Sequence, residues 1–242
     1  MSALLTLLCL FPITAIYGDH VSMKLVHLDS TKYPLAMCND GSTAGFYFKK
    51  SPTASNVWLV HLEGGGWCWD NDSCSKRRLT AVYLTTNKWW KKTILKTGIF
   101  DDNSTLNPMF DANKVFVPYC TSDGWMGYTT ARPENNHWFF MGQQVIEAVL
   151  DTLITDPLYG MGHIPKRDTL AFGGCSAGGR GAMVNLDYIP GLITAAGIEL
   201  KSIFGILDSA LYINVQPLRP YSTSTSLGTL WCSERVCFVL SF

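Results

Sequence analysis

The sequence lacks an excess of charge of either sign. Its 242 residues include 19 Lys and Arg and 19 Asp and Glu, and the formal net charge is +0 at pH 7. A chain balanced in this way has no electrostatic footprint for nucleic acid or for an anionic membrane surface. It also lacks the basic surplus that would point to a polyanionic substrate. We therefore expect no nucleic-acid partner.

Long apolar runs are missing from the chain after its first segment. Residues 4–16 are apolar, but this stretch is shorter than the roughly 20 residues that cross a bilayer. Ala15 and Gly18 are small residues beside a plausible cleavage point, which is typical of a signal peptide; a buried strand or helix is the alternative. We expect residues 1–18 to be a signal peptide, the protein to be secreted and extracellular, and no membrane span to follow.

Metal-ligand spacing is missing too, whereas cysteine is plentiful. The chain has 8 cysteines, of which Cys9 would leave with the signal peptide. The odd number that remains means that at least one is free or has lost its partner, and secretion permits disulfides. Sequons at Asn71 and Asn103 give weak support for a secreted glycoprotein. The remaining cysteines are Cys38, Cys68, Cys74, Cys120, Cys175, Cys232 and Cys237.

Short apolar runs alternate with helical patterns along residues 19–216. Such alternation predicts an α/β fold, with a mainly parallel sheet and helices on both faces. Apolar residues at spacings of three and four predict a core-facing helix from Trp138 to Leu153, and a second helix is expected over residues 177–188. Residues 217–242 have no element-sized pattern and predict an irregular tail. The predicted strands are residues 24–28, 45–48, 57–62, 114–119, 169–172 and 203–207.

The segment Gly174-Cys175-Ser176-Ala177-Gly178 matches G-x-S-x-G between a predicted strand and a predicted helix. A sharp strand-to-helix turn of this kind strains the serine backbone and exposes its hydroxyl above the sheet. The amide of Ala177, near the helix N-terminus, would then face a developing oxyanion. The alternative is an ordinary structural turn. The context favours Ser176 as the nucleophile of an ester hydrolase.

A second glycine-rich segment, Glu63-Gly64-Gly65-Gly66-Trp67, follows the predicted strand 57–62. Hydrolases with a nucleophile elbow place their other oxyanion amides in such a loop; an ordinary tight turn is the alternative. We expect the amides of Gly65 and Gly66 to join that of Ala177 in the oxyanion hole. Each such donor contributes roughly 2.7–4 kcal/mol in the transition state.

Other residues are weaker candidates. Trp67 leaves the oxyanion loop and could line a pocket for sugar or acyl groups, although aromatic core is the default for any tryptophan. Asp123 follows a predicted strand and could line the site, with a turn role equally open. His61 lies in mid-strand, and we expect it in the core or behind the site rather than in catalysis. His137 is expected to open the helix near 138 as a surface or capping residue.

Four motifs together resemble the pectin acetylesterase family of the α/β-hydrolase superfamily, which includes the Notum-type carboxylesterases. The motifs are HLEGGGWC at 61–68, GGCSAGG at 173–179, CNDGS at 38–42 and PYCTSD at 118–123. The resemblance covers about residues 35–212. It implies a secreted carboxylesterase with a Ser-Asp-His triad and with no metal or organic cofactor. It also implies a Cys38–Cys120 disulfide, a Cys68–Cys74 disulfide and a free Cys175.

One part of the family pattern is missing. In this fold the acid and the histidine follow the serine in the chain, but all 5 histidines precede Ser176. Asp208 is the one plausible acid after it, and it is better explained as fixing a loop or a helix start. We therefore expect that the C-terminal part of the domain is missing, through a truncated gene model or a frame change near residues 226–231. The histidines are His20, His27, His61, His137 and His163.

The resemblance implies that the substrate is an acyl ester, with acetyl groups on a cell-wall polysaccharide as the first expectation. Three glycines before Trp67 fit the plant-type run better than the Notum-type run, in which an aromatic residue comes one position sooner. A fatty acyl group on a protein, the Notum-type substrate, is therefore the second expectation. A non-catalytic secreted fragment is the alternative from another class, because a serine hydroxyl without a base is a poor nucleophile.

Overall fold

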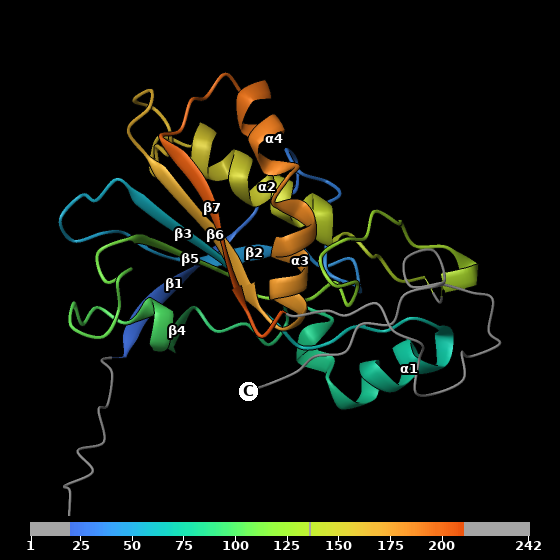
Figure 1. Ribbon diagram of the computed structural model, residues 1–242. Coiled ribbons are helices and arrows are strands. Elements are labelled where there is room, and N and C mark those ends of the chain that lie inside the picture. The colour runs from blue at the N-terminus through green and yellow to red at the C-terminus, as the bar shows by residue number, and fades with distance from the viewer. Residues whose placement is uncertain (1–19, 136, 211–242) are drawn as a thin grey trace, which may run out of the picture.

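The computed structural model describes residues 20–135 and 137–210 (Figure 1). The predicted signal peptide, residues 1–18, and the predicted tail, residues 217–242, lie outside the described residues. Within the described ranges, no helix is long and apolar enough to cross a membrane.

A single seven-stranded sheet organises the described residues, in the order β4-β1-β2-β5-β3-β6-β7. The pairs β5–β3, β3–β6 and β6–β7 are parallel, whereas β4, β1 and β2 join the sheet through antiparallel pairs. The parallel half confirms the expected α/β-hydrolase-like fold. The strands are β1 Val21–His27, β2 Gly45–Lys49, β3 Val57–Leu62, β4 Thr93–Lys96, β5 Asn113–Val117, β6 Thr169–Cys175 and β7 Ser202–Asp208.

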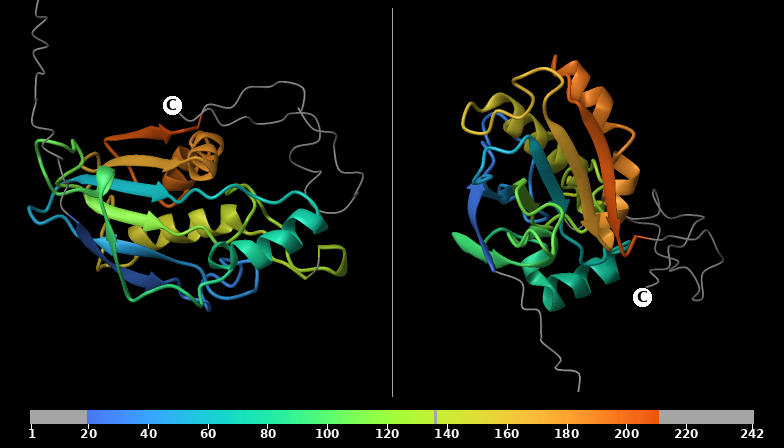
Figure 2. Two further views of the ribbon diagram at one scale, coloured as in Figure 1. Left: turned by 90° about the horizontal axis from the view of Figure 1, so that it is seen from below. Right: turned by 60° about the vertical axis from the view of Figure 1, so that its left-hand side comes forward.

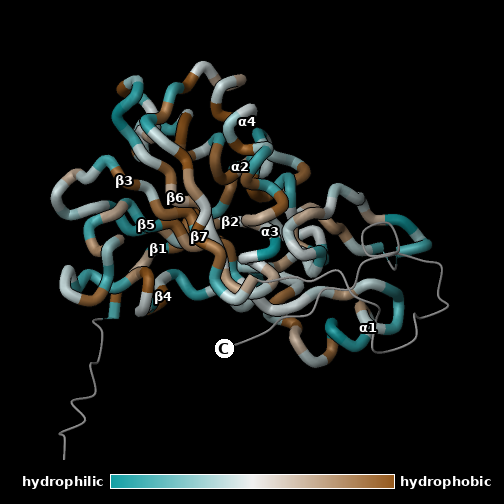
Figure 3. The backbone as a smooth tube through the Cα atoms, in the orientation of Figure 1, coloured by the Kyte–Doolittle hydropathy of each residue, from teal (hydrophilic) through white to brown (hydrophobic). Residues whose placement is uncertain are grey.

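The central parallel strands are buried on both faces because their sequences are nearly continuous apolar runs. All five residues of β5 are buried, and so are five of the six in β3. In Figure 3 the hydrophobic residues gather in these strands and in the helix α2. The predicted strand 57–62 coincides with β3, while the other predicted strands match their elements to within a few residues.

Three helices cover one face of the sheet (Figures 1 and 2): α2 Gly142–Thr155, α3 Ala177–Asn185 and α4 Ile189–Ala195. The apolar stripe of α2 packs on this face, with Val145, Val149 and Leu153 among its buried residues. The opposite face buries a second apolar cluster, which includes Phe100 from the short 3-10 helix η2 Gly98–Phe100.

The helix predicted from Trp138 begins later than expected. Phe140 still pairs with Thr129 in an isolated β-bridge, so the backbone remains extended there. The helix begins at Gly142, whose amide N–H donates to the carboxylate of Asp123. His137 is exposed, as expected of a surface residue, but it lies before the helix with φ +57°, so the prediction that it opens this helix was wrong.

A further helix, α1 Asn71–Thr80, was not predicted. It lies beyond the carboxyl ends of the parallel strands (Figure 2) and is largely hydrophilic (Figure 3). Asp70 begins it with a capping box, because the Asp70 carboxylate accepts the Ser73 N–H and the Ser73 hydroxyl oxygen accepts the Asp70 N–H. Cys74 is its one buried residue, so the cap and a disulfide at Cys74 hold this helix rather than an apolar stripe.

Candidate active site

Ser176 occupies the sharp turn between β6 and α3. Its backbone has φ 55° and ψ −119°, a strained conformation for a residue with a side chain. The turn is held from both sides, since the Ser176 N–H donates to the Asp208 carbonyl and the Arg180 N–H donates to the Ser176 carbonyl, both at 2.9 Å. This is the geometry that a nucleophile elbow requires.

The glycine-rich loop after β3 lies directly against this turn. A Cβ placed on Gly64 would come within 2.5 Å of the Cys175 carbonyl oxygen and within 3.1 Å of the Ser176 Cβ. Only a residue without a side chain allows the two segments to approach so closely. The structure therefore brings together the two glycine-rich motifs that the sequence separates by more than a hundred residues.

Glu63, the first residue of this loop, is anchored to the fold by three hydrogen bonds. Its carboxylate accepts the Tyr119 N–H at 2.8 Å, its own N–H donates to the Val117 carbonyl at 3.0 Å, and its carbonyl accepts the Trp125 indole N–H at 2.9 Å. Burial raises the pKa of Glu63 above its usual range. In the sequence Glu63 is recognisable only as part of the glycine-rich loop, and no pattern there predicts its three anchoring hydrogen bonds.

Several amide donors at the site have no acceptor among the described residues. None of the N–H groups of Gly64, Gly65 and Gly66 donates to a protein group there. Ala177 is the first residue of α3, where the backbone N–H groups have no partner within the helix. Free amides beside a helix N-terminus are suited to bind a negatively charged oxygen. The amides of Gly65, Gly66 and Ala177 are thus free to donate to a ligand, and their role in an oxyanion hole stays a prediction.

Trp67 and Asp123, the two predicted pocket residues, differ in their contacts. The Arg180 guanidinium lies over the Trp67 ring, 4.7 Å from its centroid, so Trp67 packs against the first turn of α3. Both carboxylate oxygens of Asp123 are used within the fold, accepting from the Thr121 hydroxyl and from three backbone N–H groups, among them that of Gly142. These contacts favour the turn role for Asp123. Burial raises the pKa of this carboxyl group.

The structure contains both disulfides that the family resemblance implied, and Cys175 is a free, half-buried thiol. Cys38–Cys120 ties the turn before β2 to the end of the β5 segment. Cys68–Cys74 closes a short loop between the glycine-rich segment and α1. Burial is the main cause that raises the pKa of Cys175, and the nearby Asp208 adds to it.

His61 is buried in β3, as expected, with 8% of its surface exposed. Its ring packs against Phe100 and Phe116, and its Nδ1 atom has no hydrogen-bond partner among the described residues. Burial, with a smaller effect of Lys96, lowers the pKa of His61 to about 4. The ring is therefore neutral at physiological pH. Together with Cys175 and Asp208, His61 lines a cavity on the sheet face opposite α3.

The other histidines have surroundings of their own. The His163 Nε2 atom lies 2.7 Å from the Ile154 carbonyl oxygen, and His27 stacks on Trp90. His20 and His137 are exposed. Within the part of the chain that the structure describes, no group of three or more His, Cys, Asp or Glu residues could hold a metal ion.

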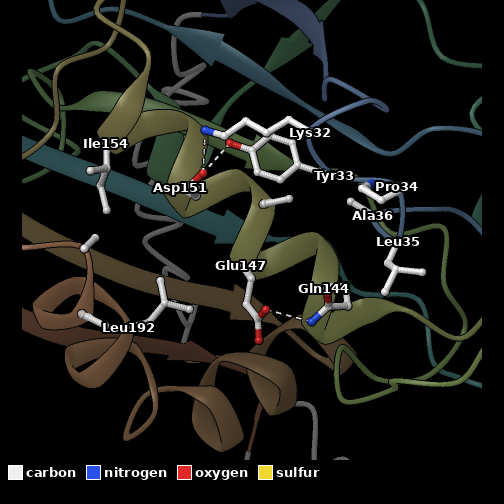
Figure 4. Close-up of a pocket in the computed structure, with 13 residues that line it drawn as sticks. Lys32, Tyr33, Pro34, Leu35, Ala36, Gln144, Glu147, Asp151, Ile154 and Leu192 are labelled. Atoms are coloured by element: carbon white, nitrogen blue, oxygen red, sulfur yellow. Dashed lines mark hydrogen bonds and ion pairs between the residues drawn. The ribbon is translucent and has the colours of Figure 1, made fainter.

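A second cavity lies away from Ser176, between α2, α4 and residues 32–36 (Figure 4). Its acidic groups already have partners. Asp151 accepts from the Tyr33 hydroxyl and pairs with Lys32, and Glu147 accepts from the Gln144 amide and from Tyr188. These bonds join α2 to its neighbours, and they leave neither carboxylate unpaired within the cavity.

Comparisons with known proteins show which family this chain is similar to. The sequence model of the pectinacetylesterase family matches residues 17–231. The palmitoleoyl-protein carboxylesterase Notum of Drosophila melanogaster is 36% identical over 215 residues, covering 86% of this chain and 31% of that protein. Human Notum is 34% identical over 197 residues, covering 81% of this chain and 38% of that protein.

A solved structure is also similar. The Wnt deacylase Notum from Drosophila has a TM-score of 0.74 at 36% identity, over 85% of this chain and 58% of that one. The chain spans about a third of the length of the curated relatives named above.

Proposed function

Because this chain belongs to the pectinacetylesterase family, whose named relatives are carboxylesterases, we propose that it carries the nucleophile and the oxyanion hole of a secreted serine esterase. One observation carries the proposal: Ser176 has the strained elbow backbone, and the free amides of the glycine-rich loop lie against it.

In the proposed reaction, the Ser176 hydroxyl attacks the ester carbonyl carbon. The carbonyl oxygen gains negative charge, and the amides of Gly65, Gly66 and Ala177 donate hydrogen bonds to it. Such donors act mainly in the transition state, where the charge has developed. Collapse of the tetrahedral intermediate expels the alcohol and leaves an acyl group on Ser176, which water then removes.

Both steps need a base for the proton of Ser176 and of the water. His61 is unsuited to this role, because its ring packs between Phe100 and Phe116 on the face of the sheet opposite α3. The other four histidines contact other groups or are exposed. None of the five histidines of this chain is therefore placed to supply the base, and the described residues contribute the nucleophile and the oxyanion donors to the proposed reaction.

The first proposed substrate is an acetyl ester on a cell-wall polysaccharide. Three consecutive glycines precede Trp67, as in the plant-type members of the family, and the Trp67 ring is covered by Arg180. A short acyl group needs little space beside the oxyanion loop, so this arrangement favours acetyl over longer chains.

A fatty acyl group on a protein is the second candidate. The observation that favours it is the similarity to Notum proteins, which are named palmitoleoyl-protein carboxylesterases, and to a structure named as a Wnt deacylase. The two candidates differ in the length of the acyl chain, which makes them easy to separate.

The experiment is a series of p-nitrophenyl esters from acetate to palmitate, with acetylated pectin as a polymeric substrate. We expect the release of nitrophenol to be fastest for acetate, acetate to be released from pectin, and both to be lost in Ser176→Ala. Faster release from long chains would favour the second candidate. Equal release by Ser176→Ala would refute the esterase proposal itself.

A further inference from the structure

Arg77 of α1 reaches back to the oxyanion loop. Its Nη1 atom donates to the Gly65 carbonyl oxygen at 2.8 Å, and its Nε atom donates to the Ser122 hydroxyl at 2.8 Å. The Ser122 hydroxyl lies 3.3 Å from the Leu84 carbonyl. The N-terminal half of α1 is also fixed, because Cys74, one turn before Arg77, forms a disulfide with Cys68. A charged side chain thus connects this helix to the peptide group between Gly65 and Gly66.

That peptide group could adopt two orientations. Gly65 has φ +135° and Gly66 has φ +65°, and neither residue has a side chain that would oppose rotation of the plane between them. In one orientation the amide N–H faces the reacting carbonyl of a substrate. In the other the carbonyl oxygen faces it, and its negative charge would repel an oxyanion.

The hydrogen bond from Arg77 to the Gly65 carbonyl oxygen favours one of these two orientations of the peptide group. The described peptide bonds are all trans, so the C=O and the N–H of one peptide point in opposite directions. With the Gly65 carbonyl held on Arg77, the Gly66 N–H is directed away from that side chain. This N–H has no acceptor among the described residues, so no other bond inside the fold competes for it.

A charged donor suits this role. Hydrogen bonds from a guanidinium are roughly twice as strong as those between neutral groups. Arg77 is half-buried, and burial lowers its pKa, so little water competes for its donors. The next residue, Arg78, is exposed, and its side chain makes no hydrogen bond or ion pair with the rest of the described residues. The two neighbouring arginines therefore offer a matched comparison.

We propose that Arg77 is a positioning residue that fixes the Gly65–Gly66 peptide with the Gly66 N–H facing Ser176. This inference rests on the proposed function only for its catalytic consequence. The orientation of the peptide is a structural claim that holds or fails without any turnover. Arg77 itself touches neither the substrate nor the reacting atoms in this account.

The test uses the full chain and three variants: Arg77→Met, which removes every donor but keeps the length; Arg77→Lys, which keeps the charge; and Arg78→Met as the control. The N–H residual dipolar coupling of Gly66, measured by NMR, reports the orientation of that bond. We expect the wild-type coupling to match an N–H directed toward Ser176, and we expect it to change in Arg77→Met but not in Arg78→Met.

The second measurement is acylation by p-nitrophenyl acetate, followed as the burst of nitrophenol. We expect Arg77→Met to slow acylation by roughly tenfold to 100-fold, below the loss of a whole oxyanion donor, with the half-saturating ester concentration within about twofold. Arg77→Lys should recover part of the rate, whereas general loosening of the fold would not be rescued in this way. Arg78→Met should react like the wild type.

The outcomes separate the two proposals. A Gly66 coupling that is unchanged in Arg77→Met would overturn the positioning role. A wild-type coupling that places the N–H away from Ser176 would do so even if Arg77→Met failed to fold. A changed coupling with an unchanged acylation rate would remove the catalytic consequence. No acylation of the wild-type chain would count against the proposed function, while the couplings would still decide the orientation.

Discussion

Gly178 lies so close to Leu62 that a Cβ on the glycine would fall 2.1 Å from the Leu62 carbonyl oxygen. Helix α3 therefore rests directly on the end of β3, and this contact sets the position of the elbow relative to the oxyanion loop. Because the obstructing atom belongs to the backbone, it cannot rotate aside as a side chain would. We expect Gly178→Ala to push α3 away from β3 and to lower the free energy of unfolding by about 1–3 kcal/mol.

The control for this prediction is Gly191→Ala in α4, where a Cβ would meet nothing within 4 Å. This change should be neutral or slightly stabilising, because alanine favours a helix more than glycine does. Unfolding of both variants and the wild type in denaturant measures the change in the free energy of unfolding. Equal stability of Gly178→Ala and the wild type would contradict the close packing.

The buried ring of His61 should make the protein sensitive to acid. The pKa of His61 is about 4 in the folded protein and 6.5 in the unfolded chain, so the unfolded chain binds the proton first as the pH falls. The free energy of unfolding should therefore have its full value above pH 6.5 and should decrease as the pH falls from 6.5 to about 4. A difference of about 2.5 in pKa corresponds to about 3 kcal/mol.

His61→Phe should remove this dependence, because phenylalanine fits among the neighbouring rings of Phe100 and Phe116 and carries no proton. Unfolding in urea at a series of pH values measures the slope. His137→Gln, which changes an exposed histidine, is the control and should keep the wild-type slope. A His61→Phe protein that still lost this stability across the same range would show that another group is responsible.

The two disulfides should contribute unequally to stability. Cys38–Cys120 closes a segment with a sequence separation of 82, and Cys68–Cys74 one of 6. Loop entropy predicts losses of about 4.5 and about 2 kcal/mol when each pair is replaced by alanine. The second pair adjoins the oxyanion loop, so we expect its loss to slow acylation more than the loss of the first pair. Free thiols at all four positions in a peptide map without reductant would refute both bridges.

This chain should turn over esters slowly. Its oxyanion donors can supply roughly 10³–10⁴-fold over water without a triad, but the positions of its histidines leave Ser176 without the base that this fold requires. We expect a rate well below the ordinary range of about 1 s⁻¹ or more, measured on purified protein with p-nitrophenyl acetate. Turnover at an ordinary rate that Ser176→Ala abolishes would show that a base is present, and His61 would be the first residue to replace.

Elements could be predicted from the sequence where the local residue pattern and the tertiary environment favour the same structure. Continuous apolar runs predicted the central strands, since both faces of a parallel strand are buried. The elbow at Ser176 was predicted because its glycines, strand and helix occur together in a short segment. Cys175 and the paired cysteines were assigned through the family resemblance rather than from spacing.

Other elements depend on contacts that the sequence does not display. Helix α1 has little apolar periodicity and is held by the Asp70 cap and by Cys74. Strand β4 is a short edge strand, and among the described strands its one partner is β1. The start of α2 is fixed by Asp123, which lies 19 residues before Gly142 in the chain. Arg77 had no signal at all, because its role arises only when α1 packs against the oxyanion loop.

The central claim is that Ser176 is the nucleophile, and the most direct test is to find where the acyl group attaches. The full chain is incubated with excess p-nitrophenyl acetate, quenched in acid and mapped by peptide mass spectrometry. We expect one acetyl group on Ser176, formed faster than on any lysine, and no such adduct in Ser176→Ala. An acetyl group that forms at another residue at the same rate in both proteins, with Ser176 unmodified, would contradict it.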